Sequence, residues 1–241
     1  MATARNYRYY DFVMVAFVTV LICSNLIGPA KIAQVDTPWL AWIHPSLATL
    51  AFGAGVLFFP ISYVFGDILT EVYGYAYSRR VIWAGFAALA FASFMAFVIV
   101  KLPPAPFWPN QSVYEVAFGN TWRIAGASMI AYFCGEFVNS YTLAKMKIMT
   151  RGRWLWTRTI GSTIFGEGVD SLIFYPLALY GTGILPNDKI PVAMLAQFVG
   201  KVLVEVVFTP VTYAVVGWLK RVEHEDYYDR NTRFTPFTLQ T

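Results

Sequence analysis

Residues 81–100 read VIWAGFAALAFASFMAFVIV, a run that contains no charged residue. As a helix it would be about 30 Å long, which matches the hydrocarbon core of a bilayer. The run therefore predicts a membrane-spanning helix. The rest of the chain agrees, because 57% of its 241 residues are hydrophobic and only 13% are charged. Soluble domains carry about 25% charged residues, so this composition favours an integral membrane protein.

Five further segments are apolar over about 20 residues, the length that a spanning helix needs. Together with the run above, the predicted spans are Tyr10–Pro29, Ser46–Phe65, Arg80–Val100, Ile124–Lys145, Thr159–Tyr180 and Val192–Trp218. We therefore predict an all-α integral membrane protein. Residues 1–241 are expected to form a single domain of six transmembrane helices that ends in a tail over residues 219–241. The first span is expected to be kept, because no A-x-A-like cleavage site follows it.

The lysines and arginines indicate how the six spans are oriented. Thirteen of the 18 lie before the first span, after the last, or in and beside the second and fourth connections. Basic residues are enriched in the cytoplasmic loops of membrane proteins. We therefore expect both termini in the cytoplasm, in a multi-pass protein of the cell inner membrane. The same rule accounts for the net charge of +4 without a nucleic-acid partner.

Polar residues recur at fixed spacing inside the predicted spans. The fourth span contains Glu136 and Asn139, and the fifth contains Glu167 and Asp170, each pair three positions apart and followed by a serine. A separation of three or four places side chains on one face of a helix. The sixth span carries a similar stripe, and the first span adds an amide near its end: these residues are Gln197, Lys201, Glu205 and Asn25.

The carboxyl groups in these stripes are costly in a membrane. A charge at the bilayer centre costs about 2.5–3.5 kcal/mol on insertion scales, and four carboxyl groups accompany the single lysine of the sixth span. Such groups persist when they are protonated, hydrated in a cavity or matched by a ligand. One interpretation is a set of hydrogen bonds that only hold the helices together. The other is a shared binding cavity, which coordinated acidic faces on three helices favour.

A second acidic group is expected at the cytoplasmic end of the second span. Asp67, Thr70 and Glu71 share one helix face, and Arg80 follows shortly after them. Both a gate and a structural salt-bridge cluster are consistent with this group.

The third span carries a ridge of small side chains. Its alanines recur every four residues, at Ala84, Ala88, Ala92 and Ala96. Small residues let helix backbones approach closely in lipid. The ridge could therefore contact another helix of the same chain or form the interface of a homo-oligomer.

No enzyme, metal or cofactor motif occurs in the chain. The two histidines, His44 and His224, lie outside the predicted spans, and no H-E-x-x-H, G-x-S-x-G, P-loop or G-x-G-x-x-G pattern is present. We expect no catalytic residue, no metal and no cofactor, although a pairing of Ser171 with Lys201 keeps a membrane enzyme as an alternative. Six short-looped helices with polar residues near the midplane are typical of a carrier for a small solute.

The chain also resembles a known transporter family. FFPISYVFGDILTEVYGYAYSRRVIW (58–83) is similar to the D-x-x-T-E-x-Y-G-x-x-x-x-R-R signature of the queuosine precursor transporters, formerly grouped as vitamin uptake transporters. The family's first, fifth and sixth spans resemble ICSNLIGPAKI (22–32), GEGVDSLIFYPLALYG (166–181) and GKVLVEVVFTPVTYAVV (200–216). The tail YYDRNTRFTPF (227–237) is similar to the family's acidic-aromatic ending, with Thr235 in place of an asparagine.

This resemblance implies import of 7-deazaguanine precursors of the tRNA nucleoside queuosine, in the nitrile form, the aminomethyl form or as the base queuine. It also implies a six-helix fold related to the substrate-binding subunits of energy-coupling-factor vitamin importers. A 7-deazaguanine presents an amide N–H and an amine side by side, which match one carboxylate, that of Glu136 or Glu167. We expect the other contacts from Asp170, Lys201, Glu205, Asn139, Gln197 and Asn25, and stacking from Phe137, Phe165 or Phe174.

Two alternatives to a self-sufficient carrier stay open. The first is a substrate-binding subunit that docks on an energy-coupling module. Those subunits usually present an A-x-x-x-A face on the first helix, whereas the first span here offers valine, phenylalanine and leucine, which disfavours this alternative. The second is a polar structural or assembly protein that binds no small base. Protons and sodium ions are both open as the driving ion.

Overall fold

The computed structural model describes residues 7–27, 31–42, 48–54, 58–119, 122–183 and 186–238. Its α-helices are α1 (Tyr10–Leu26), α2 (Phe59–Ile68), α3 (Tyr75–Lys101), α4 (Gln111–Phe118), α5 (Trp122–Met149), α6 (Leu155–Leu179) and α7 (Ile190–Glu223). A π-helix, η4 (Leu69–Tyr73), continues α2, and the short 3-10 turns are η1 (Pro38–Leu40) and η5 (Asn187–Lys189). Strands β1 (Ile32–Asp36) and β2 (Thr49–Gly53) pair antiparallel.

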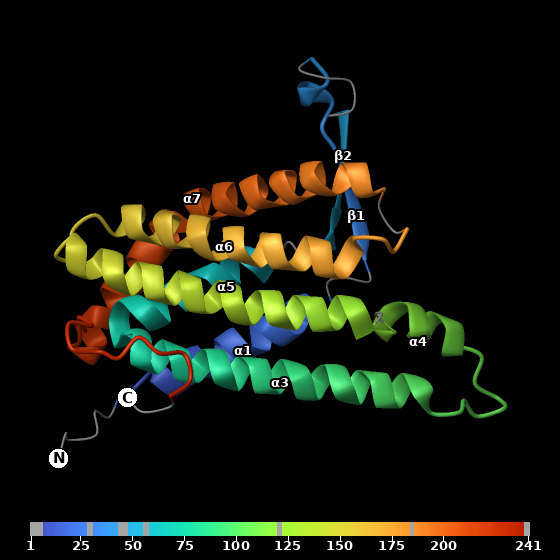
Figure 1. The fold of residues 1–241 in the computed structure, drawn as a ribbon, viewed down its shortest axis with the longest axis horizontal. Helices are drawn as coiled ribbons and strands as arrows, with labels where there is room; N and C mark the ends of the chain where they lie inside the picture. The colour runs from blue at the N-terminus through green and yellow to red at the C-terminus, as the bar shows by residue number, and fades with distance from the viewer. Residues whose placement is uncertain are drawn as a thin grey trace.

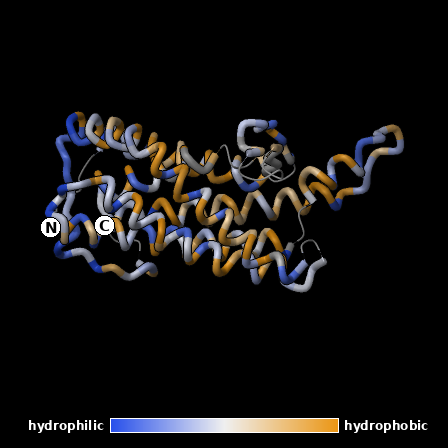
Figure 2. Tube along the Cα trace, turned by 90° about the horizontal axis from the view of Figure 1, so that it is seen from above, coloured by the Kyte–Doolittle hydropathy of each residue, from blue (hydrophilic) through white to orange (hydrophobic). Residues whose placement is uncertain are grey.

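The long helices lie side by side in one bundle, with the most extensive contact between α5 and α6 (Figure 1). Both described ends of the chain meet at one end of this bundle. There the backbone N–H groups of Arg8 and Tyr9 donate to the carboxylate of Glu223 at 2.9 and 2.7 Å. We call this the tail end. Figure 2 shows hydrophilic residues concentrated at the tail end, while the helices beyond it are mostly hydrophobic.

The outer surface of the bundle is apolar. Among the described residues, α3 and α7 are long and apolar enough to cross a membrane, and α1 is a shorter apolar helix. On α3 the rings of Phe91, Phe94 and Phe97 are 67%, 60% and 56% exposed. Contiguous exposed apolar surface marks contact with a membrane or with another protein. The fold is therefore mostly helical, with an apolar outer surface that suits a membrane protein.

The second predicted span differs from the structure. The sequence predicts one helix over Ser46–Phe65, whereas Thr49–Gly53 form strand β2 and α2 begins only at Phe59. The helix prediction is therefore wrong for the first part of that span. An apolar run does not by itself distinguish a strand from a helix. Pro60 favours a helix start because the first turn has no intrahelical use for the N–H that proline lacks.

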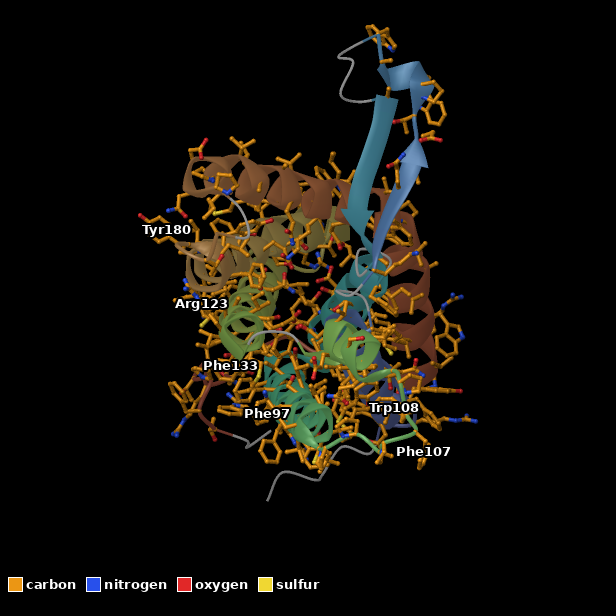
Figure 3. The ribbon with its side chains drawn as sticks, turned by 90° about the vertical axis from the view of Figure 1, so that its right-hand side faces the viewer. Phe97, Phe107, Trp108, Arg123, Phe133 and Tyr180 are labelled. Carbon is orange, nitrogen blue, oxygen red and sulfur yellow. The ribbon has the colours of Figure 1, made fainter. Side chains whose placement is uncertain are left out.

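The remaining spans are helical, with ends that differ by a few residues from the prediction. The φ angle of 87° at Gly74 ends η4, so α3 begins at Tyr75 rather than at Arg80. The connection after α3 contains the short helix α4, which the sequence analysis does not predict. Figure 3 shows Phe107 and Trp108 of that connection at the edge of the molecule. His44 and parts of the first two predicted spans, residues 28, 29, 46, 47 and 55–57, lie outside the described residues.

Two glycines let α5 and α6 approach closely. A Cβ atom at Gly166 would lie 2.7 Å from the Cβ of Asn139 and 2.9 Å from the carbonyl oxygen of Gly135. A Cβ atom at Gly135 would lie 3.0 Å from the Cβ of Asp170. The contact is thus made almost backbone to backbone, as small residues allow in membrane helices. It sets the polar stripes of α5 and α6 beside each other.

We expect Gly166→Ala to destabilise the bundle, because the added methyl group must push α5 and α6 apart. Overpacking of this kind costs about 1–3 kcal/mol. Gly126→Ala is the matched control on α5, since a Cβ atom there meets nothing within 4 Å. The thermal unfolding midpoint of the purified protein in detergent measures both variants. Equal midpoints would contradict the close contact between the two helices.

Candidate functional site

A cavity of about 230 Å³ lies inside the bundle. Residues of α1, α2, α5, α6 and α7 line it. Pockets for drug-sized ligands enclose about 300–1,000 Å³, so this one suits a small solute. Most of the residues that line it are polar, with Ser24, Ser62, Ser128, Tyr132 and Thr163 beside the predicted site residues.

Most of the residues that the sequence analysis proposes for substrate binding meet in this cavity. Three polar stripes converge there because Gly135 and Gly166 hold α5 against α6, while α7 packs on α6. The lining includes Asn25, Glu136, Asn139, Glu167, Asp170, Phe174, Gln197 and Lys201.

One lysine serves two carboxylates of the cavity. Lys201 is 7% exposed, and its Nζ donates to Glu167 and, at 3.0 Å, to Oδ2 of Asp170. Glu167 and Asp170 lie three residues apart, so they share one face of α6, and Lys201 of α7 reaches both from the opposite side. Two ionised carboxylates and one ammonium leave one negative charge at this point of the wall.

Glu136 faces the same cavity from α5. It has no hydrogen-bond or ion-pair partner among the residues that the structure describes, and it lies beside Gly66 on α2. A Cβ atom at Gly66 would lie 3.5 Å from Oε2 of Glu136. The carboxylate is therefore accessible to a solute that offers hydrogen-bond donors.

Two amides of the lining are already oriented by neighbours. The Tyr175 hydroxyl donates to Oε1 of Gln197, and the Ser128 hydroxyl donates to Oδ1 of Asn25 at 2.8 Å. Asn25 in turn donates to the carbonyl oxygen of Leu21 at 2.9 Å. Asn25 thus ties α1 to α5, whereas the amide nitrogen of Gln197 can still donate into the cavity.

Three of the proposed substrate-binding residues lie outside the cavity lining. Phe137 packs into an aromatic cluster, with ring centroids 4.8 Å from Phe133 and 6.5 Å from Tyr75. Glu205 is 0% exposed and lies one turn beyond Lys201 toward the tail end. Phe165, the third aromatic candidate, is 60% exposed on the outside of α6. Helical spacing alone does not show which face of a helix lines the cavity, because that depends on how the neighbouring helices pack.

Glu71 lies in a buried ion-pair cluster at the tail end. Arg158 donates to both of its oxygens at 2.7 Å, Lys220 donates at 2.5 Å, and Nζ of Lys147 lies 3.6 Å away. Asp226 completes the cluster at 2.6 Å from Lys147 and 2.7 Å from Lys220. The sequence analysis does not identify Arg158, Lys147 and Lys220 as partners of Glu71. The signal that was available is the carboxylate itself, because an acidic residue next to an apolar segment needs a cation nearby.

The cluster keeps Glu71 ionised. Burial opposes ionisation, but hydrogen bonds from Arg158 and the charges of Lys147 and Lys220 outweigh it and hold the pKa of Glu71 below its ordinary value. Of the other two proposed gate residues, Asp67 is buried one turn away from Glu71. Arg80 is exposed and lies with Trp83, Ala84, Ala87 and Phe237 at a surface hollow. Arg80 is therefore not a member of the Glu71 cluster.

The C-terminal tail, residues 224–238, docks over this end of the bundle. The carboxylate of Asp229 accepts the backbone N–H of Tyr75 at 3.1 Å. The Arg79 guanidinium, 1% exposed, donates to the carbonyl oxygens of Arg233 and Thr235 at 2.9 and 2.7 Å. Because the contact at position 235 is made by the backbone, threonine can replace asparagine there without losing it.

Residues 53–215 match the sequence profile of a family described as "Putative vitamin uptake transporter". The chain belongs to this family. The match confirms the family resemblance seen in the sequence, and it makes this protein a transporter rather than an enzyme. The matched segment contains every acidic residue of the cavity and of the Glu71 cluster except Asp226.

Two curated relatives are similar to this transporter over most of its length. A "Probable queuosine precursor transporter" of Bacillus subtilis (strain 168) is 29% identical over 204 residues, 84% of this chain and 82% of the relative. A "Queuosine precursor transporter" of Escherichia coli (strain K12) is 28% identical over 166 residues, 67% of this chain and 71% of the relative. No solved structure matches the chain.

Proposed function

We propose that this transporter imports 7-deazaguanine precursors of queuosine and binds them in the cavity between α5, α6 and α7. The observation that carries the proposal is Glu136, a carboxylate that lines the cavity and has no partner among the described residues. A 7-deazaguanine offers an amide N–H and an amine side by side, and one carboxylate accepts both. The names of the two curated relatives support the same class of solute.

The rest of the lining suits the other edges of such a base. The amide nitrogen of Gln197 can donate to the base carbonyl, since its oxygen is engaged by Tyr175. The ring of Phe174 can cover a flat face of the base. The negative charge left by Glu167, Asp170 and Lys201 suits the cation of the aminomethyl form and tolerates the neutral nitrile form and queuine.

We further propose that the tail end faces the cytoplasm of the inner membrane. The basic residues Arg79, Lys147, Arg158 and Lys220 lie at this end, and such residues are enriched on the cytoplasmic side. Import then means passage from the far end of the bundle, through the cavity, toward the Glu71 cluster.

A rescue experiment tests the proposed function. In cells that can neither make nor import the base, expression of this chain is expected to restore queuosine in tRNA when one of the three precursors is supplied. Glu136→Gln should lower the rescue at least tenfold, because an amide loses one of the two acceptor oxygens. Glu115→Gln, on the exposed face of α4, should leave it unchanged.

The same assay distinguishes the competing explanations. Absence of rescue by all three bases, with the chain detected in the membrane, would contradict the proposed function. Rescue that depends on a co-expressed ATPase and scaffold subunit would instead indicate a docking subunit of an energy-coupling importer.

A further inference from the structure

Two buried carboxyl groups lie next to the cavity without lining it. Asp67 in α2 is 1% exposed and Glu205 in α7 is 0% exposed. The helices α2 and α7 pack against each other, and the two carboxyl groups lie within hydrogen-bonding reach of one another. In the described part of the chain, all four carboxylate oxygens nevertheless lack a hydrogen-bond donor. We call these two residues the acidic pair.

The acidic pair lies between the cavity and the tail end. Glu205 follows Lys201 by four residues on α7, and Asp67 precedes Glu71 by four residues. Four residues of helix are about one turn, or about 6 Å. The pair is therefore one turn from the cavity on one helix and one turn from the ion-pair cluster on the other.

The ionisable groups that face the acidic pair are themselves acidic. The charges of Glu136 on α5 and Glu71 on η4 act on Asp67, and the charge of Glu167 on α6 acts on Glu205. Asn139 is also a neighbour of Asp67, but its buried Oδ1 lacks a donor as well. The amide of Asn139 is thus the one neutral donor near Asp67, and it makes no hydrogen bond of good geometry to either oxygen of that carboxyl group among the described residues.

The nearby cations are engaged by other carboxylates. Lys201, the cation one turn away on α7, is held by Glu167 and Asp170. The cations of the tail end, Arg158, Lys147 and Lys220, contact Glu71 or Asp226. No salt bridge reaches Asp67 or Glu205 from the residues that the structure describes.

Two ionised carboxylates cannot persist side by side in such surroundings. A buried charge without a counter-ion or donor costs several kcal/mol, and a neighbouring like charge adds to that cost. One proton removes the repulsion between like charges and gives the remaining carboxylate a donor, because the protonated group donates its O–H to it. A metal ion is the other solution, but no group of three His, Cys, Asp or Glu side chains suited to one occurs in the described ranges.

We propose that Asp67 and Glu205 share one exchangeable proton and form the site through which import is coupled to the proton gradient. The coupling part rests on the proposed function, because it requires a transported solute. The proton reaches the pair from the cavity side, past Glu136 and Glu167, and leaves past Glu71 toward the tail end. One O–H bond of a hydronium ion breaks as a carboxylate oxygen of the pair takes the proton, and the carboxyl O–H bond breaks in turn when the proton passes to a water molecule on the tail-end side.

The structure also offers a means by which the solute controls this proton. Lys201 is held by Glu167, and the charge of Glu167 acts on Glu205. A cationic or donor-rich solute that engages Glu167 changes the charge next to Glu205. The proton affinity of the pair then changes with occupancy of the cavity, which is the linkage that coupled transport needs.

The proton site can be tested without transport. Infrared spectra of the purified protein in detergent should contain the C=O stretching band of a buried protonated carboxyl group, which disappears at alkaline pH. Asp67→Asn combined with Glu205→Gln should remove this band, each single substitution should shift its frequency because the remaining carboxyl group loses its partner, and Glu115→Gln should leave it unchanged. Persistence of the wild-type band in the double variant would overturn the proton site. Monodisperse elution of each variant verifies that it is folded, and Glu205→Asp retains the titratable group if Glu205→Gln fails to fold.

Coupling is tested in proteoliposomes with the radiolabelled aminomethyl base. The wild-type protein should accumulate the base under a pH gradient, and Asp67→Asn and Glu205→Gln should reduce that accumulation at least tenfold while base exchange across the membrane continues. Accumulation driven by a sodium gradient alone, or unchanged pH-driven accumulation in both variants, would overturn the coupling role. Absence of exchange in the wild-type protein would count against the proposed function instead, and the infrared experiment would still decide the proton site.

Discussion

Lys201→Met is expected to abolish precursor uptake, with a loss of at least a hundredfold relative to the wild-type protein. The ammonium group is buried and donates to both Glu167 and Asp170. Its removal leaves two adjacent carboxylates without a counter-ion in the cavity wall. Breaking a buried ion pair by removing one partner costs about 3–5 kcal/mol, and each ~1.4 kcal/mol corresponds to a tenfold change.

Uptake of radiolabelled base into vesicles, normalised to the amount of protein in the membrane, measures this effect. Lys101→Met is the matched control, because Lys101 is exposed at the end of α3. A double variant, Lys201→Met with Glu167→Gln, restores the charge balance and should recover the folded protein without recovering uptake. Uptake near the wild-type rate from Lys201→Met alone would remove this lysine and its two carboxylates from the transport site.

Glu71→Gln is expected to cause the largest loss of stability among single substitutions at the tail end. The amide keeps the size of the side chain but leaves Lys147 and Lys220 with Asp226 as their remaining acidic partner, and it leaves Arg158 with no acidic partner among the described residues. Uncompensated buried charge of this kind costs about 3–5 kcal/mol. At about 2–4 °C per kcal/mol for a chain of this size, the thermal unfolding midpoint should fall by about 10 °C.

Arg80→Gln provides the comparison for Glu71→Gln. Arg80 belongs to the same sequence motif but is exposed and lies outside the cluster, so its midpoint should stay within about 2 °C of the wild type, as surface substitutions usually do. Similar midpoints for the two variants would show that the Glu71 cluster does not hold the tail end together.

Part of the site follows from the sequence because helical periodicity is a local property. Glu167 and Asp170 must share a face of α6 whatever surrounds that helix, and so must Gln197 and Lys201 on α7. The cost of charge in a membrane then predicts that these faces meet polar groups rather than lipid. The cavity lining agrees with this expectation for Glu136, Asn139 and the residues just named.

Other parts could not be predicted in this way. Glu205 lies on the same stripe as Lys201, yet it packs against Asp67 of α2 instead of facing the cavity. Arg158 and Lys220 count in the sequence only as basic residues near helix ends, but both reach Glu71. The hairpin of β1 and β2 was missed because an apolar run of strand length has the same composition as part of a spanning helix.

Composition and spacing alone predict a helical membrane protein with acidic stripes on α5, α6 and α7, because burial in lipid and the helical repeat act within a single segment. The family motif adds the class of transporter. Which stripe faces which is decided by the rotation and axial offset of whole helices. Those depend on close contacts such as that of Gly135 with Gly166, between residues 31 positions apart. Only the assembled bundle therefore separates the lysine-bridged carboxylates of the cavity from the acidic pair beneath them.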